Sequence, residues 1–546
     1  MPERWYKQAV VYSLDVETFQ DSDGDGIGDL RGLINRLDYL ARLGVTCLWL
    51  NPIHPTPNRD DGYDVTDFYG VDPRIGSLGD FVELVHQCEN RGLRLMIDLV
   101  VNHTSNEHPW FQSARGNPDS PYRDWYVWSK AEPANKDEGE VFPGYQRGTW
   151  SFDEEAGLWY HHRFYDFQPD LNWSNPEVRE EIGRVVAFWL QLGVSGFRMD
   201  AAPFVIEEIH PDSADRRFVF EWLNDLHDHI AWRRGDGIML AEANVDRALI
   251  PEYFGPRGNR IQMLFNFLVN PRIFLALARS SAAPLVTAIE SSPPIPEQCG
   301  WATFLRNHDE VDLSRLQESE RADVFDAFGP DQNMQLYGRG IRRRLAPMLG
   351  NDRRRIELAY VLQFTLPGTP VLRYGEEIGM GDDLSLPQRD SIRTPMQWSD
   401  APQAGFTSSD KPVRPLVAEG DCGYPRVNVT AQRADPGSLL SWFERMLRSL
   451  RECPEFGIGQ ATVLDPKNDA VLAVRFDCPV GTIVALTNLV DEECTVDLSP
   501  QPGTGRKPLD VFANRPYEPG PTDLSAVELD GWGYRWIRLA RPIAPG

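Results

Sequence analysis

The chain has 546 residues, more than one simple core accommodates, so two to four structural units are expected. Its formal net charge of -26 argues against nucleic acid or an anionic membrane as a partner. The seven cysteines include no C-x-x-C pair, and the N-terminus has no apolar signal core. We therefore expect free thiols in a cytoplasmic protein that acts on a neutral or cationic small molecule. The sequence leaves open whether the protein forms a homo-oligomer.

Short apolar runs alternate with amphipathic stretches from residue 9 to residue 452. Eight runs are predicted to be strands: "AVVYSLD", "CLWL", "LRLMIDLVV", "GFRMDA", "GIMLAEA", "MLFNF", "ATFLRNHD" and "PVLRYGEE". Alternation of eight strands with helices predicts an α/β fold, the (β/α)8 TIM barrel. A doubly wound open sheet is the alternative, but no Gly-rich phosphate fingerprint follows the first strand.

Two segments depart from this alternation. Residues 104–174, after the third strand, are rich in Trp, Tyr and Phe and too long for an ordinary loop, which predicts an inserted lid subdomain over the barrel mouth. Beyond the helix expected at Ser438–Glu452, the runs "AVLAVRFDC", "GTIVALTNL" and "ECTVDLS" alternate like antiparallel strands. We expect a barrel over residues 1–103 and 175–453, the insert over 104–174, and a C-terminal β-sandwich domain over 454–546.

Polar residues end four of the predicted strands, in "DLVVNH", "GFRMD", "LAEAN" and "LRNHDE". The carboxyl ends of barrel strands are where the active sites of such folds lie. One such residue can be a structural polar group, but several at the same end favour a site. The carboxylates Asp200, Glu242 and Asp309 around one cavity suit glycoside chemistry with a nucleophile and an acid/base. A zinc hydrolase is disfavoured because no H-E-x-x-H spacing occurs.

These four segments, in this order, resemble the signature regions of the α-amylase superfamily, and "QPDLNW" resembles its additional region before the fourth strand. The resemblance implies that Asp200 is the nucleophile, Glu242 the acid/base and Asp309 the transition-state stabiliser. It also implies a glucose subsite lined by Asp60, Tyr63, His103, Arg198, His308 and Arg393. The segments "RDDGYD" and "SIRTPMQW", which carry Asp60 and Arg393, resemble the pocket-closing pair of exo-acting α-glucosidases and imply short substrates.

Within this superfamily, segments such as "NRDDGYDVTDFYGVDPRIGSLGDF" and "GIRRRLAPML" are most similar to the trehalose synthases. That resemblance implies a retaining α-glucosyl enzyme that interconverts maltose and trehalose through a covalent glucosyl-Asp intermediate. Hydrolysis by an exo-acting α-glucosidase is the alternative, because the same carboxylates serve both reactions. A non-catalytic sugar-binding relative is disfavoured by the intact carboxylates. The chain departs from that family at Asp15, where a His is usual, and in "GFRMDAAPFV".

The stretch "DSDGDGIGD" matches the first nine positions of an EF-hand loop, but Gly32 stands where the closing glutamate is required. This spacing predicts a structural Ca²⁺ site rather than a sensor, with these ligands: Asp21, Asp23, Asp25, the Ile27 carbonyl and Asp29. An Asp/Gly turn without metal is the alternative. The trehalose synthase resemblance implies a second Ca²⁺ site formed by Asn102, Asp170, the Phe204 and Val205 carbonyls, and Glu207.

Overall fold

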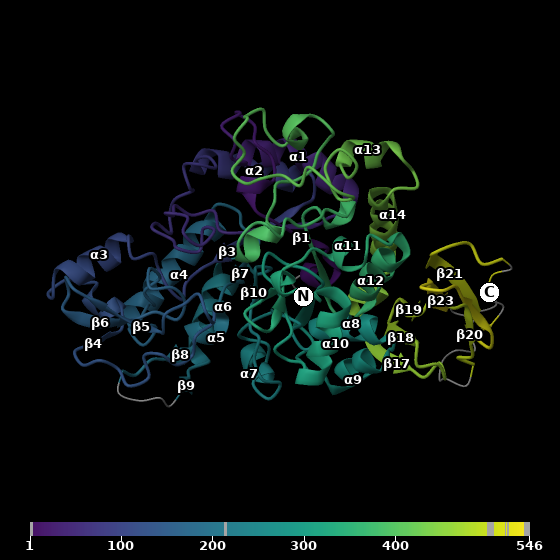
Figure 1. Ribbon diagram of the computed structural model, residues 1–546. Helices are drawn as coiled ribbons and strands as arrows, with labels where there is room; N and C mark the ends of the chain where they lie inside the picture. The colour runs from purple at the N-terminus through teal and green to yellow at the C-terminus, as the bar shows by residue number, and fades with distance from the viewer. Residues whose placement is uncertain (1–3, 212–215, 500–506, 519, 521–522, 540–546) are drawn as a thin grey trace.

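Eight parallel strands close a barrel in the middle of the molecule (Figure 1). The structure is a computed structural model that describes residues 4–211, 216–499, 507–518, 520 and 523–539. The barrel strands are β1 (Val11–Leu14), β2 (Cys47–Leu50), β3 (Arg94–Leu99), β7 (Gly196–Met199), β10 (Ile238–Ala241), β11 (Met263–Phe265), β12 (Gly300–Phe304) and β16 (Thr369–Arg373). They neighbour one another in the order β1-β16-β12-β11-β10-β7-β3-β2. The predicted TIM barrel is confirmed, and the open-sheet alternative is wrong.

Alternating residues of each barrel strand face opposite sides. In β2, Cys47 and Trp49 join the apolar cluster inside the barrel, whereas Leu48 and Leu50 pack against the surrounding helices. The inward face changes character towards the carboxyl ends. Asp98 of β3 and Arg198 of β7 lie directly opposite each other in the ladder, and both are buried. A charged layer therefore covers the apolar interior, and the active site is built on it.

Helices surround the barrel: α1 (Leu30–Leu43), α2 (Leu78–Asn90), α4 (Pro176–Gln191), α6 (Glu221–Arg233), α7 (Ile250–Phe254), α8 (Asn270–Arg279), α9 (Ala283–Ser291), α12 (Arg353–Thr365) and α14 (Leu439–Arg451). The first of them, α1, begins where the Asp29 side chain accepts a hydrogen bond from the Gly32 N–H. It ends at Gly44, whose φ of 107° suits glycine. These two caps fix where α1 begins and ends after β1.

The insert, residues 104–174, forms a small unit of its own after β3. It holds α3 (Pro109–Gly116) and a three-stranded sheet of β4 (Trp128–Ser129), β5 (Trp150–Asp153) and β6 (Leu158–His161). The ring of Phe111 packs on those of Tyr126 and Tyr160, with centroids 5.0 and 5.3 Å away. Most of the aromatic residues that predicted a lid thus form the insert's own core. In Figure 1 the insert lies on the opposite side of the barrel from the C-terminal strands.

Shorter elements complete the loops around the barrel: α5 (Ala202–Val205), β8 (Glu207–Glu208), β9 (Arg217–Phe218), β13 (Val311–Asp312), α10 (Glu318–Phe328), β14 (Gln335–Leu336), β15 (Gly340–Ile341), α11 (Leu345–Met348), α13 (Val429–Ala434) and α15 (Glu455–Ile458). The strands β13, β15 and β14 form one small antiparallel sheet after the seventh barrel strand. We call residues 311–341 the β13–β15 segment. It faces the insert across the barrel mouth.

The chain ends in an antiparallel β domain. Five strands, β17 (Gln460–Leu464), β18 (Val471–Cys478), β19 (Gly481–Asn488), β21 (Pro508–Ala513) and β23 (Tyr534–Leu539), form one sheet, and β20 (Cys494–Val496) pairs with β22 (Val527–Leu529). Val496 and Leu529 share a buried core with Ile537, so the two sheets face each other. The domain is joined to the barrel by the Tyr534 hydroxyl, which donates to Glu357 of α12 at 2.7 Å. None of the helices described here has the length and apolar character needed to cross a membrane.

Candidate active site

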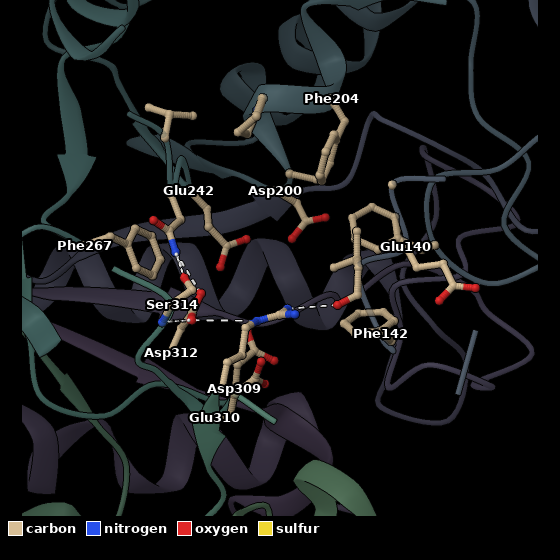
Figure 2. A pocket seen from close by; sticks show the side chains of 18 of the residues that line it. Glu140, Phe142, Asp200, Phe204, Glu242, Phe267, Asp309, Glu310, Asp312 and Ser314 are labelled. Carbon is tan, nitrogen blue, oxygen red and sulfur yellow. Dashed lines mark hydrogen bonds and ion pairs between the residues drawn. The ribbon is translucent and has the colours of Figure 1, made fainter. Parts of the chain in front are cut away.

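A cavity of about 720 Å³ opens at the carboxyl ends of the barrel strands. Seven of the residues expected around the sugar line it: Asp60, Tyr63, His103, Asp200, Glu242, His308 and Asp309. In Figure 2, Asp200 and Glu242 enter from one side and Asp309 from the opposite side. The local chain explains this placement, because Asp200 directly follows β7 and Glu242 directly follows β10. Asp309 comes five residues after β12, in the loop rather than at the strand end.

Arg198 joins the carboxylates beneath the cavity. Its guanidinium nitrogens lie 2.7 Å from Asp200 Oδ1, 2.6 Å from Glu242 Oε2 and 2.8 Å from Asp98 Oδ1. The Arg198 side chain is 1% exposed. Removing one partner of a buried charge network leaves an uncompensated charge, so these contacts fix the carboxylates in position. Asp98 was not predicted from the sequence; the available signal was a carboxylate inside the apolar run "LMIDLVV".

Burial sets the protonation states of the two carboxylates nearest Arg198. Desolvation raises the pKa of Asp200 to about 6, although the Arg198 charge opposes it. Desolvation also raises the pKa of Glu242 to about 7, again against Arg198, and the negative charge of Asp200 adds to that rise. Near neutral pH, Asp200 is therefore mostly ionised while Glu242 is partly protonated. Asp200 is therefore ionised, as a nucleophile must be, and Glu242 holds the proton that a general acid donates.

Two arginines hold Asp309. Arg389 Nη1 lies 2.6 Å and Arg393 Nη2 3.2 Å from Asp309 Oδ1. Although burial raises the pKa of Asp309, the neighbouring His308, Arg389 and Arg393 lower it well below its usual range. Asp309 therefore stays ionised throughout the neutral range. A fixed negative charge at this place can stabilise positive charge that develops on a bound sugar.

The pocket-closing pair differs from the one implied by the sequence motifs. Arg389 Nη2 lies 3.3 Å from Asp60 Oδ1, and Gln168 donates to the other Asp60 oxygen at 2.9 Å. Arg393 pairs instead with Asp61, at 2.7 Å, and lies behind the cavity wall. The reason is local: Arg389 and Arg393 are one short turn apart, and only Arg389 projects into the cavity. Arg389 is a site residue that the sequence analysis missed.

Tyr63 and the two histidines form the remaining wall of the glucose subsite. The Tyr63 ring stacks on His308, with centroids 5.6 Å apart, and its hydroxyl contacts His308 Nε2 at 2.8 Å and Asp98 at 3.1 Å. His103 Nε2 lies 3.0 Å from the Tyr63 carbonyl. All three side chains are buried. Contacts with one another and with Asp98 thus hold these side chains in place at the cavity wall.

The outer part of the cavity is roofed by the insert and the β13–β15 segment. Phe142 of the insert packs on Tyr337, with ring centroids 5.3 Å apart, and the Arg389 guanidinium lies 4.9 Å from the Phe142 ring centre. Arg339 donates to the Val141 carbonyl at 2.8 Å and approaches Asp312 at 3.7 Å. The insert is therefore tied to the opposite rim. Phe142 and Phe164 are its aromatic residues that line the cavity, whereas Trp125 and Tyr126 lie inside the insert.

The first loop brings three of its predicted calcium ligands together. Carboxylate oxygens of Asp21, Asp23 and Asp29 lie within 4.8 Å of one another. Among the residues that the structure describes, no basic side chain forms an ion pair with them. The Asp25 carboxylate lies outside this group and accepts the Ile27 N–H at 2.7 Å. Converging carboxylates without a counter-charge fit a hard cation with oxygen ligands.

The second predicted set does not have this character. Asn102 donates to Asp170 at 3.0 Å, and His161 lies 2.8 Å from the other Asp170 oxygen. The Glu207 carboxylate is bound by two guanidinium groups, Arg163 at 3.0 Å and Arg216 at 3.1 Å. The negative charge of Glu207 is already balanced by two arginines, and the oxygens of Asp170 are bound by His161 and Asn102. As arranged, these residues do not fit a calcium ion.

Comparison of the sequence with known protein families agrees with this geometry. A family model described as "Alpha amylase, catalytic domain" matches residues 14–327 and 337–456. The chain belongs to the α-amylase family. The matched ranges contain the residues that surround the cavity, including the three carboxylates: Asp200 and Glu242 directly after β7 and β10, and Asp309 in the loop after β12.

Relatives within this family extend over nearly the whole chain. The trehalose synthase of Pimelobacter sp. (strain R48) is 39% identical over 99% of this chain and 97% of that protein. The trehalose synthase/amylase of Mycobacterium tuberculosis (strain CDC 1551 / Oshkosh) is 41% identical over 98% of this chain and 90% of that protein. Among solved structures, the trehalulose synthase from Pseudomonas mesoacidophila MX-45 is similar with a TM-score of 0.76 at 25% identity, covering 98% of this chain and 99% of that one.

Proposed function

We propose that the protein is a retaining α-glucosyl enzyme that interconverts maltose and trehalose. The observation that carries the proposal is the identity of about two residues in five with trehalose synthases over almost the full chain. The cavity supports it, because Asp60 and Arg389 close the glucose end while the insert roofs the other end. Hydrolysis of short α-glucosides is the second candidate, favoured by a relative whose name includes an amylase.

The reaction follows from the positions of the carboxylates. Asp200 attacks the anomeric carbon of the non-reducing glucose as Glu242 protonates the glycosidic oxygen, so that bond breaks and a glucosyl-Asp200 ester forms. The released glucose turns within the roofed cavity. Its own anomeric hydroxyl then attacks the anomeric carbon of the bound glucosyl group, Glu242 takes the proton, and the bond from that carbon to the Asp200 oxygen breaks. No atom is gained or lost, so the product is an isomer; attack by water would give two glucose molecules.

Exclusion of water decides between the two outcomes, and Phe142 is the side chain best placed to enforce it. We expect wild-type protein to convert maltose into trehalose faster than it releases glucose. Phe142→Ala should open the contact with Tyr337 and raise glucose release several-fold relative to isomer formation, because water then competes for the same ester. The measurement is chromatographic resolution of maltose, trehalose and glucose over time, from either disaccharide.

The matched control is Phe152→Ala. Phe152 is also in the insert, but it is half exposed and lies outside the cavity lining. It should leave the product ratio unchanged. Wild-type protein that releases glucose from both disaccharides without forming the isomer would exclude the isomerase, and the hydrolytic function would stand.

We further propose that Asp21, Asp23 and Asp29 hold a structural Ca²⁺ ion. Such an ion would pin the loop after β1 against the start of α1, which Asp29 caps. A ligand that binds only the folded state stabilises it by about 2.7 kcal/mol at a hundredfold excess over Kd. Asp21→Ala combined with Asp23→Ala should therefore lower Tm and abolish its rise with added Ca²⁺. A melting series with and without chelator tests this.

Asp25→Ala serves as the comparison within the same loop. Its carboxylate stands apart from the other three, so its Tm should keep most of the Ca²⁺ dependence. If the double variant retains the full Ca²⁺ dependence, the ion binds elsewhere. The proposed site is structural, so activity at low temperature should change little.

The cysteines bear on where the protein is located. Each of the seven cysteines is free, which suits a reducing compartment. We propose a cytoplasmic location on that ground.

A further inference from the structure

Arg414 connects three parts of the chain outside the cavity. It lies in the irregular segment between β16 and α13, and its side chain is 14% exposed. Its Nη2 lies 3.1 Å from Glu17 Oε1 and also contacts Asp61 Oδ1. Its Nη1 donates to the Arg393 carbonyl at 3.4 Å and lies 3.8 Å from Asp390. One guanidinium thus joins the loop after β1, the loop after β2 and the turn that carries Arg389 and Arg393.

Asp61 is held in an uncommon backbone conformation by these contacts. Its φ is +53°, a region that side-chain-bearing residues rarely adopt, and Gly62 follows with a φ of +91°. This turn sends adjacent carboxylates in different directions. Asp60 points into the cavity towards Arg389, whereas Asp61 lies between Arg393 and Arg414. Such a conformation persists where its surroundings fix it, and strained residues of this kind cluster at functional sites.

Arg393 passes the constraint on to the reacting centre. Its Nη1 binds Asp61 at 2.7 Å, its Nε donates to the His308 carbonyl at 2.9 Å, and its Nη2 lies 3.2 Å from Asp309. The Arg393 side chain is 5% exposed, so it has little freedom to find other partners. Two residues, Asp61 and Arg393, therefore link Arg414 to Asp309.

The charges around Arg414 indicate what its loss would do. Oxygens of Asp15, Glu17 and Asp61 lie within 4.8 Å of one another, and Arg414 is the cation that contacts both Glu17 and Asp61. Arg74 binds Glu17 from the far side, at 3.2 Å, and is shared with Asp72. Without Arg414, the nearest remaining cation for Asp61 is Arg393. The uncompensated negative charge of Asp15, Glu17 and Asp61 would then draw the Arg393 guanidinium away from Asp309.

We propose that Arg414 is a positioning residue for the glucose subsite, acting on Asp309 through Asp61 and Arg393. The inference rests on the proposed glucosyl transfer, and it holds whether the glucosyl group is transferred to glucose or to water. It assigns a role in transition-state stabilisation to a side chain that does not itself line the cavity. The charge of Asp309 would remain in the variants, but its position would not.

Arg414→Gln tests the proposal with an activated aryl α-glucoside as donor. We expect kcat to fall about 10- to 100-fold with a small change in KM, because displacement of a group that acts in the transition state costs rate rather than binding. Arg414→Lys, which keeps the charge but not the forked contacts, should recover part of the loss. Asp61→Asn should resemble Arg414→Gln, and the double variant should be no slower than either.

Arg535→Gln is the matched control. Arg535 is a buried arginine of the C-terminal sheet, bound to Asp510 at 2.7 Å and to the Glu528 carbonyl at 3.0 Å. Its loss should lower Tm and leave kcat unchanged below the melting range. If Arg414→Gln and Asp61→Asn also lower Tm while kcat stays at the wild-type value, Arg414 is merely structural and the proposal is wrong. Additive losses in the double variant would overturn it too. Arg414→Lys and Asp61→Asn decide the question if Arg414→Gln fails to fold.

The aryl donor separates this inference from the proposed isomerisation. Wild-type turnover of that donor without conversion of maltose into trehalose would remove the isomerase function and leave the Arg414 effect measurable. Absence of any glucosyl transfer by the wild type would overturn both.

Discussion

Asp200→Ala should abolish glucosyl transfer, with kcat lowered by about 10,000-fold or more on any donor. Asp200 is the carboxylate whose oxygen would bond to the anomeric carbon, and an alanine leaves nothing to form the ester. The buried Arg198 would keep its contacts with Asp98 and Glu242, so the variant should remain folded. A fluorinated glucosyl donor that reacts slowly should label the wild type at Asp200, as read by mass spectrometry of peptides.

The labelling position is the decisive part of that experiment. Both Glu242 and Asp309 line the same cavity, and each could in principle be alkylated. A label on either of them, or turnover of Asp200→Ala near the wild-type rate, would contradict the assignment. Circular dichroism and Tm of the variant give the control for folding.

Glu242→Gln should discriminate between donors. An amide of the same size cannot donate its proton to the leaving oxygen, so cleavage of maltose should slow by about 100- to 10,000-fold. An activated aryl glucoside needs little protonation and should still form the glucosyl ester, which then accumulates because deglycosylation also needs the base. Equal losses on both donors would show that Glu242 is not the acid.

The pH profile gives a second reading of the same pair. When the pH falls below the Asp200 pKa of about 6, Asp200 gains a proton and can no longer attack, so kcat/KM falls towards acid pH. When the pH rises above the Glu242 pKa of about 7, Glu242 loses the proton that it must donate, so kcat/KM falls towards alkaline pH. The wild type should therefore show a narrow bell. With the aryl donor, Glu242→Gln should retain the acid limb and lose the alkaline one.

The residues that could be predicted from the sequence are those attached to regular strands. Asp200 and Glu242 follow β7 and β10 directly, and the barrel topology brings all strand ends to one face. Asp309 was found in the same way, although four residues separate it from β12. Once the strands are assigned, the positions of these carboxylates follow from the geometry of the barrel.

The residues that were missed depend on contacts between irregular segments. Arg389 lies in a short turn. It pairs with Asp60 because its side chain reaches the cavity, whereas Arg393 pairs with Asp61 outside the cavity. Asp98 lies within a strand, but its role requires knowledge that β3 neighbours β7 in register with Arg198. Arg414 lies in an irregular segment that has no helical or strand pattern of apolar residues from which its position could be predicted. The aromatic residues of the insert indicated a lid, but aromatic content could not show that most of them pack together and that Phe142 reaches the cavity.

The Asp60–Arg389 contact has a consequence for how the enzyme meets long glucans. Because the pair closes the glucose end, a sugar chain can enter only with its non-reducing terminus first. The effective substrate concentration is then the molarity of chain ends rather than the mass of carbohydrate. At equal weight, a disaccharide presents many ends and a polymer few. The rate would therefore follow the number of non-reducing ends present.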